Sequence, residues 1–255
     1  MTSRELSPRL PGSSREQLNV RMQVYAVLRE SVIVGDLPPG ALISENDLAM
    51  RYGVSRTPVR EAVIRLAEED LVEVLPQRGT FVSRISVTDV REMQFVRDTL
   101  ERASLIQAIE RMNPETERTL SRILRDQVDA AESGDTLGWF ATDEDFHRTL
   151  LEVAGHPKVW PIVHAAKAHL DRVRLLSLPQ PSAFDDLHDE HAEILRHVVD
   201  GDIAGADRVM AAHLHRALDT LESLERTRPD YFREDAPQRN VRTVGRSGSR
   251  ARHDR

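Results

Sequence analysis

Residues 53–72, "GVSRTPVREAVIRLAEEDLV", place a glycine turn, three arginines and an apolar stripe in one short segment. The stripe consists of Val59, Ala62, Val63 and Leu66. Because these positions recur at helical spacing, they predict a helix that packs one face on a core. We expect this helix to begin near Thr57-Pro58, since threonine is a good N-cap and proline is tolerated in a first turn. Its arginines then lie on the solvent side.

The segments on both sides of this helix complete a small domain. Upstream, residues 20–34 carry apolar residues at helical spacing and predict a first helix. Ser44 with Asp47 is typical of a capping box, and it starts a short second helix that ends at Gly53. Downstream, "LVEVLP" and "TFVSRI" are extended runs joined by the turn "QRG". Three helices closed by a β-hairpin wing predict a winged helix-turn-helix over residues 18–86.

The rest of the chain is predicted to be helical as well. Aromatic residues make up only 4% of the sequence, whereas Leu, Val, Ala, Arg and Glu recur in long runs. Residues 87–228 follow helical spacing between turn signals, which indicates an all-α bundle of about six helices. Pro161 falls inside one expected helix, residues 158–176, so that helix must start or kink there. The predicted fold class is therefore mainly α.

The formal net charge of -7 is spread unevenly along the chain. Residues 1–86 contain 11 basic and 11 acidic side chains, whereas residues 87–228 contain 17 and 27. The excess acid belongs to the helical part, so clustered arginines can set the local field of the neutral N-terminal part. The ends, residues 1–17 and the basic residues 229–255, are rich in Pro, Gly, Ser and Arg and are expected to be disordered.

Composition also excludes several kinds of site. The chain has no cysteine, which excludes disulfides, thiolate metal sites and cysteine nucleophiles. No apolar run has the length of a signal peptide or of a membrane span, which needs about 18 residues. We therefore expect a cytoplasmic protein with no membrane partner.

A cluster of polar residues at the start of the 53–72 helix predicts contact with double-stranded DNA. The second helix of a helix-turn-helix lies in the major groove and presents its first residues to base edges. Arginine can grip guanine or clamp phosphate, and hydroxyls and free backbone N–H groups suit phosphate. The candidate residues are Arg51, Ser55, Arg56, Thr57, Arg60 and, at the wing tip, Arg78. The alternative is that these are ordinary solvated side chains.

The run "GDLPPGALISENDLAMRYGVSRTPVREAVIRLAEEDLVEVLPQRGTFV" resembles the DNA-binding domain of the GntR family of bacterial transcription regulators. Its most diagnostic parts are "SRTPVREA" and the wing "RGTFV". The resemblance implies operator DNA as the partner and DNA-contacting roles for Arg51, Arg56, Thr57, Arg60 and Gly79. Asp70 stands where the family commonly has glycine, a change expected to affect the end of the helix more than its reading face.

A second set of residues has the chemistry of a metal site. Asp143 and His147 are four residues apart, so on a helix they share one face. With His191 and His213 from two further helices, they would form an N/O site for zinc, nickel or manganese in the bundle core. The chain has ten histidines, so ordinary buried or exposed histidines are the alternative. A second alternative is a metalloenzyme in which Glu144 acts as general base. Glu144 is adjacent to Asp143, however, which rotates it by about 100° around the helix and away from the ligand face.

The helical part resembles the FCD ligand-binding domain of the FadR branch of GntR regulators, through "VRDTLE", "DEDFHRTLLEVAGHP" and "EHAEILRHVVDGDIAGADRVMAAHLH". The resemblance implies a divalent metal, zinc first, at Asp143, His147, His191 and His213. It also implies a small organic acid as effector, with Arg97 as a second anchor. The expected protein is a homodimer that binds a near-palindromic operator and represses until the effector releases it. Activation, and a bundle that only dimerises around a structural metal, are the alternatives.

Overall fold

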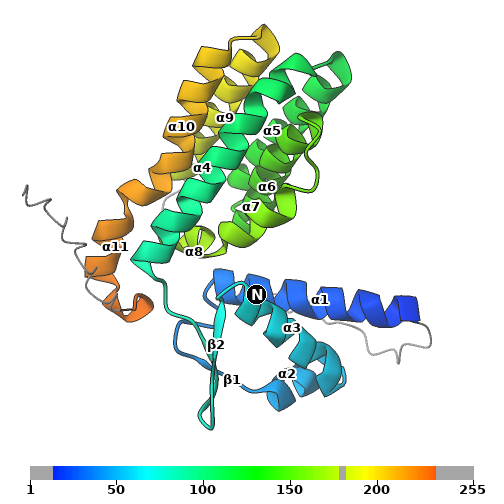
Figure 1. The fold of residues 1–255 in the computed structure, drawn as a ribbon, viewed down its shortest axis with the longest axis vertical. Helices are drawn as coiled ribbons and strands as arrows, with labels where there is room; N and C mark the ends of the chain where they lie inside the picture. The colour runs from blue at the N-terminus through cyan, green and yellow to red at the C-terminus, as the bar shows by residue number, and fades with distance from the viewer. Residues whose placement is uncertain (1–13, 178–181, 234–255) are drawn as a thin grey trace, which may run out of the picture.

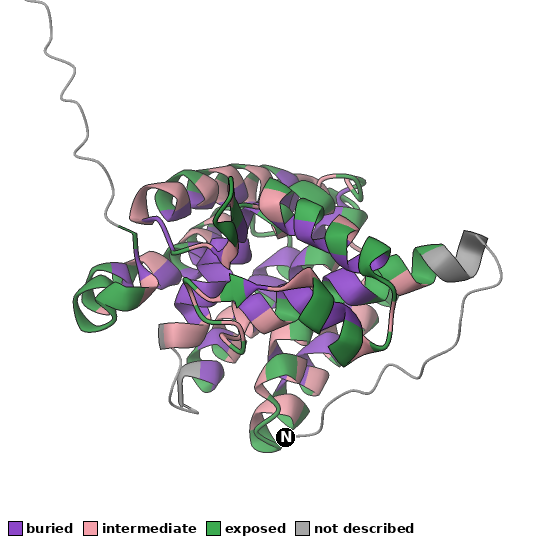
Figure 2. Ribbon diagram, turned by 90° about the horizontal axis from the view of Figure 1, so that it is seen from below, coloured by how far each residue is buried: buried purple, intermediate pink, exposed green. Residues whose placement is uncertain are grey.

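The computed structural model describes residues 14–177 and 182–233. They form a small N-terminal domain beside a long helical bundle (Figure 1). Buried residues follow the inward faces of the helices in both parts, as Figure 2 shows. None of the helices in the described ranges is long and apolar enough to cross a membrane.

The N-terminal domain is a winged helix-turn-helix, as the sequence predicted. Its elements are α1 (Ser14–Ile33), β1 (Leu42–Ile43), α2 (Glu45–Tyr52), α3 (Arg56–Glu68), β2 (Val72–Leu75) and β3 (Gly79–Val82). The three strands form an antiparallel sheet of order β1-β3-β2. Strand β1 was not predicted, because two residues are too few to show an alternating pattern. Helix α1 begins at Ser14, inside the terminus that was expected to be disordered.

Local sequence signals explain the helix-turn-helix. The Ser44 side chain accepts a hydrogen bond from the Asp47 backbone N–H, and Gly53 ends α2 with a φ of 63°. The predicted apolar stripe of α3 is buried in one core with Val24 and Leu28 of α1. The N-cap of α3 is Ser55 rather than Thr57, so the helix starts two residues earlier than predicted.

The bundle contains eight α-helices within the described residues. They are α4 (Val87–Glu110), α5 (Pro114–Glu132), α6 (Thr136–Val153), α7 (Trp160–Ala166), α8 (Ala168–Ser177), α9 (Ser182–Asp200), α10 (Ile203–Asp219) and α11 (Leu221–Thr227). About six were predicted. The expected helix over 158–176 is two helices, and Pro161 lies in the first turn of α7. The break predicted at 178–181 lies outside the described residues.

The C-terminal end of the described chain folds back on the junction between the two parts. Residues Pro229–Tyr231 form a 3-10 turn, and Phe232 is buried in a small core with Ile85 and Leu170. The Ile85 backbone N–H donates to the Tyr231 carbonyl at 2.9 Å. The predicted tail therefore includes at least five ordered residues, 229–233, while residues 234–255 lie outside the described part.

Candidate functional site

The predicted reading residues of α3 lie on its exposed face. Arg56, Thr57 and Arg60 are exposed, whereas Val59 between them is fully buried. The Arg56 side chain is 67% exposed and lies 3.4 Å from a Glu45 carboxylate oxygen. A polyanion can displace such an exposed ion pair at little cost, because exposed pairs contribute at most about 1 kcal/mol.

The N-terminus of α3 keeps its backbone donors available. Ser55 makes no side-chain capping bond there, and the first turn contains no acidic residue. By contrast, the N-caps of α2 and α4 accept hydrogen bonds from their own helices. Uncapped N–H groups together with the helix dipole suit a phosphate or another acceptor.

The wing tip, at the end of the winged domain farthest from the bundle (Figure 1), carries two further predicted DNA contacts, Arg78 and Gly79. Its turn is closed by the Arg78 N–H, which donates to the Leu75 carbonyl at 3.1 Å. Gln77 has a φ of 62°, and Gly79 has a φ of 117°. A Cβ atom on Gly79 would lie 2.9 Å from Leu42 Cδ1 of β1, so only glycine fits there without movement. Arg78 at this tip is exposed, as is Arg51 in the last turn of α2.

The bundle brings the four predicted metal-ligating residues together. Helix α6 supplies Asp143 and His147, α9 supplies His191, and α10 supplies His213. All four are buried, and one donor atom from each lies within 4.8 Å of the others. His213 Nε2 is 3.2 Å from both His147 Nε2 and His191 Nε2, and Asp143 Oδ1 is 3.5 Å from His191 Nε2. Such a cluster could hold one divalent metal ion.

Polar neighbours indicate which nitrogen of His213 and His147 carries the proton. The acceptors at Nδ1 are Glu190 Oε2 at 2.9 Å for His213 and Glu101 Oε2 at 2.6 Å for His147. His191 Nδ1 instead faces the Gln127 side-chain amide, with Nε2 at 3.0 Å and Oε1 at 3.1 Å. An acceptor at Nδ1 places the proton there and leaves the Nε2 lone pair toward the centre. These three polar neighbours were not predicted from the sequence.

The charge states also suit a metal. Burial raises the pKa of Asp143, but the Arg174 guanidinium outweighs this effect and holds the pKa well below its usual value. Arg174 forms two bonds to the carboxylate, Nη2 to Oδ1 at 2.8 Å and Nη1 to Oδ2 at 2.9 Å. Burial lowers the pKa of His191 and brings that of His213 to about 4. One carboxylate is therefore ionised, while these two imidazoles are neutral at pH 7.

Arg97, the predicted effector anchor, is buried beside this centre. Its Nε donates to Glu101 Oε1 at 2.6 Å, and its Nη2 lies 3.2 Å from His147 Nε2. Burial raises the pKa of Glu101, but Arg97 and His147 together lower it to about 2. Glu144 is bonded instead to Lys167 at 2.9 Å, which leaves the imagined catalytic base engaged outside the centre.

Comparisons with known proteins agree with both parts of this architecture. Residues 21–82 match the bacterial regulatory proteins of the gntR family, and residues 92–216 match the FCD domain. The chain is 39% identical to an uncharacterized HTH-type transcriptional regulator in an unstable DNA locus of Streptomyces ambofaciens, across 87% of this chain and 93% of that protein. It is 32% identical to the HTH-type transcriptional repressor RspR of Escherichia coli K12, across 85% and 95%.

Solved structures share the fold at lower identity. McbR/YncC of E. coli gives a TM-score of 0.71 at 22% identity, over 80% of this chain and 97% of that chain. A GntR regulator from Rhodococcus sp. RHA1 gives 0.64 at 22% identity, over 84% and 100%. The family matches and the names of these relatives indicate a regulator rather than the metalloenzyme that the histidines alone left open. The chain belongs to the GntR family of DNA-binding transcription regulators, with a FadR-like architecture in which an FCD domain follows the winged helix-turn-helix.

Proposed function

We propose that this regulator reads its operator through the start of α3 and the wing. The observation that carries the proposal is the exposed, uncapped start of α3, where Arg56, Thr57 and Arg60 surround free backbone donors. Arg56 and Arg60 would contact base edges, and Ser55 would contact phosphate. The contacts to the flanking backbone would come from Arg51, Arg78 and the close approach at Gly79.

The second part of the proposal is a divalent metal held by Asp143, His147, His191 and His213. Two neutral imidazoles, an ionised carboxylate and converging donor atoms fit a borderline ion. Zinc is the ion we expect, with nickel and manganese as alternatives. Four protein ligands leave a position open on a five- or six-coordinate ion, and the carboxylate of a small organic acid would fill it. Arg97 would bind that acid as well, and the position of its guanidinium 3.2 Å from His147 Nε2 supports this role.

The third part of the proposal concerns the oligomeric state and whether the protein represses or activates transcription. A homodimer places two reading helices on a near-palindromic operator, with half-sites spaced by the helical repeat of DNA. Phe95 of α4 is 71% exposed, and Ile106 is 43% exposed three turns further along, which supports a second copy on this face. We propose repression relieved by the effector, in the cytoplasm. The related E. coli protein RspR is named a transcriptional repressor, which supports repression here.

Selection of DNA from a randomised duplex library by the purified full chain tests the reading surface. We expect a near-palindromic consensus, and we expect Arg56→Ala and Arg60→Ala each to cost about 1–3 kcal/mol of discrimination at one base pair. Arg148→Ala, on the exposed side of α6, is the matched control and should bind like the wild type. If both α3 variants keep the wild-type sequence preference, the assignment is wrong.

Metal and oligomer need separate measurements. Elemental analysis of the purified protein should find about one divalent ion per chain, and sedimentation should give a dimer. A metal-free protein that also fails to bind added zinc, nickel or manganese would exclude the proposed centre without affecting the proposed reading surface.

A further inference from the structure

Helix α8 contacts both the candidate metal centre and the end of the reading helix. It is only ten residues long, Ala168–Ser177. Near its C-terminal end, Arg174 forms two hydrogen bonds to the candidate ligand Asp143. At its N-terminal end, Ala168 is fully buried within the core of the winged domain. One short rigid element therefore bridges the two domains.

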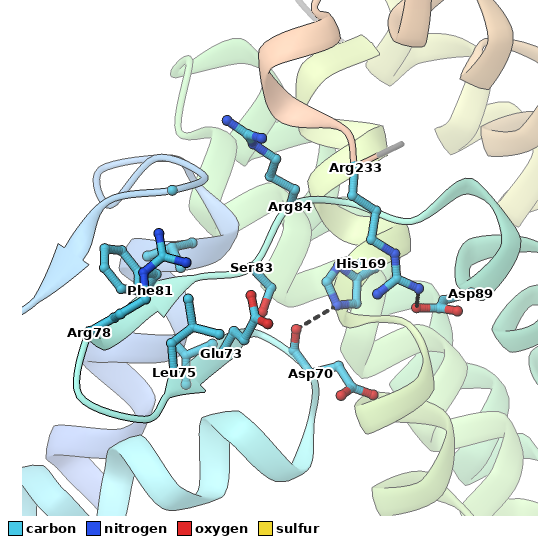
Figure 3. A pocket seen from close by; sticks show the side chains of 13 residues that line it. Asp70, Glu73, Leu75, Arg78, Phe81, Ser83, Arg84, Asp89, His169 and Arg233 are labelled. Carbon is cyan, nitrogen blue, oxygen red and sulfur yellow. Dashed lines mark hydrogen bonds and ion pairs between the residues drawn. The ribbon is translucent and has the colours of Figure 1, made fainter. Parts of the chain in front are cut away.

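A side chain of α8 also binds the C-terminal end of α3 directly. His169 Nε2 donates to the Asp70 carbonyl at 3.0 Å, as Figure 3 shows. Asp70 follows Glu69, the C-cap of α3, and has a φ of 56°, so its carbonyl is turned out of the helix toward α8. Arg172 Nη1 lies 3.3 Å from the other ring nitrogen of His169 and fixes the imidazole orientation. This bond ties α8 to the element that we propose reads DNA.

A second set of contacts runs in parallel through α7. Arg29 of α1 donates from Nη2 to the His164 carbonyl at 2.9 Å and from Nε to Glu69 at 3.0 Å. Glu69 is the C-cap of α3. Lys167, between α7 and α8, is buried and bonds Glu144, the neighbour of Asp143. The α7–α8 segment is thus attached to α6 beside the candidate centre and to α3 at its far end.

The chain just after α3 borders an open space at Asp70. A cavity of about 620 Å³ opens between the wing and the bundle, and Asp70 and His169 form part of its wall (Figure 3). A close-packed junction would resist small displacements, because protein interiors have few voids. Here the bond from α8 to α3 lies at the edge of an open space, so a movement of α8 can move the end of α3.

We propose that His169 and Arg174 are positioning residues that couple occupancy of the metal centre to the placement of α3. The inference rests on the proposed metal site. A cation held by Asp143 would share that carboxylate with Arg174. It would also repel the Arg174 guanidinium, which has the same sign of charge, and so weaken the Arg174–Asp143 pair. Helix α8 transmits this change to Asp70 through His169. Zinc therefore changes DNA affinity, and DNA changes zinc affinity by the same factor.

The test changes His169, at the end of α8 that contacts none of the candidate metal ligands. The probes are zinc chloride and the duplex selected by the wild-type protein, and DNA affinity is measured on dialysed full-length protein with and without zinc. Zinc affinity is measured separately by calorimetry. The variants are His169→Ala, which removes the donor, and His169→Gln, whose amide can still donate to the Asp70 carbonyl. His215→Ala, an exposed histidine of α10, is the matched control.

We expect His169→Ala to bind zinc within about twofold of the wild type, while its ratio of DNA affinities with and without zinc shrinks by about two- to twelvefold, the range for one hydrogen bond. His169→Gln should recover part of the ratio, and His215→Ala all of it. A His169→Ala variant that keeps the full wild-type ratio overturns the inference and leaves the proposed metal site intact. A wild-type protein that binds zinc with no change in DNA affinity also overturns the inference, and failure to bind zinc overturns the proposed site with it.

Discussion

Replacement of His191 by phenylalanine should remove most of the stabilisation by zinc while the fold is kept. His191 is fully buried and its ring stacks on Phe146 at 4.6 Å between centroids, so an aromatic ring of similar size fits the same space. The change removes the polar neighbour of buried Gln127, a loss that costs about 1–3 kcal/mol. For a chain of this size, that corresponds to a fall of roughly 2–12 °C in the Tm of the metal-free protein.

The informative quantity is the shift in Tm that zinc produces. Zinc at 100 times its Kd stabilises the wild type by about 2.7 kcal/mol, or roughly 5–11 °C. If the loss of one ligand raises the Kd about 100-fold, the same zinc concentration stabilises His191→Phe by only about 0.4 kcal/mol. His215→Phe should keep the full shift, because the His215 side chain is 53% exposed. If zinc raises the Tm of His191→Phe as much as it raises that of the wild type, the assignment of this ring as a ligand is refuted.

Three further changes probe the fold and its pH dependence. Leu66→Ala removes a fully buried side chain from the core under α3 and should lower the free energy of unfolding by about 2–5 kcal/mol in urea titrations. Gly79→Ala should weaken DNA binding and lower the Tm, because the new Cβ atom would clash with Leu42 and alanine is strained at a φ of 117°. Adding Leu42→Ala to the same chain should recover only part of the lost Tm and affinity, since it removes the clash but not the backbone strain. Burial lowers the pKa of His169 and His213 to about 4 in the folded protein. Between about pH 6.5 and 4 the unfolded chain binds protons that the folded one does not, so the stability of metal-free protein should be complete above pH 6.5 and fall as the pH drops through this window. Stability that stays constant from pH 7 to 5 would contradict this.

The helix-turn-helix could be predicted because its signals are local. The stripe of α3, the Ser44 cap and the left-handed Gly53 each lie within a few residues of the feature they specify. The division of residues 158–176 into α7 and α8 could not be predicted in the same way. Lys167 at the break is buried between Glu144 and Asp171, and these carboxylates reach it through tertiary packing rather than through a turn signal.

The candidate metal centre, too, could be predicted from the sequence only in part. Spacing placed Asp143 and His147 on one helical face. Ligand chemistry suggested His191 and His213 as their partners, but the family resemblance was needed to choose these two among the ten histidines. The partner of Asp143, Arg174, lies on another helix, and nothing in the sequence distinguishes it from Arg172 two residues earlier. Which of the two faces α6 depends on how α8 crosses the bundle, and periodicity alone does not determine that crossing.

The charges around the centre favour an anionic effector once a metal is present. Two buried ion pairs include or contact the candidate ligands, Asp143 with Arg174 and Glu101 with Arg97, and each pair is neutral overall. A divalent cation would add two positive charges that this buried set does not balance, and a carboxylate bound beside the ion would offset one of them. At an effective dielectric of 20, two unit charges 4 Å apart interact by about 4 kcal/mol before dehydration costs, so an appreciable part should remain as affinity. Small organic acids should therefore bind the zinc-loaded protein at least about tenfold more tightly than the metal-free protein in calorimetric titrations, whereas their uncharged amides should show no such preference. Equal binding of an acid to both forms would contradict this reasoning, because the acid would then draw its affinity from contacts independent of the metal.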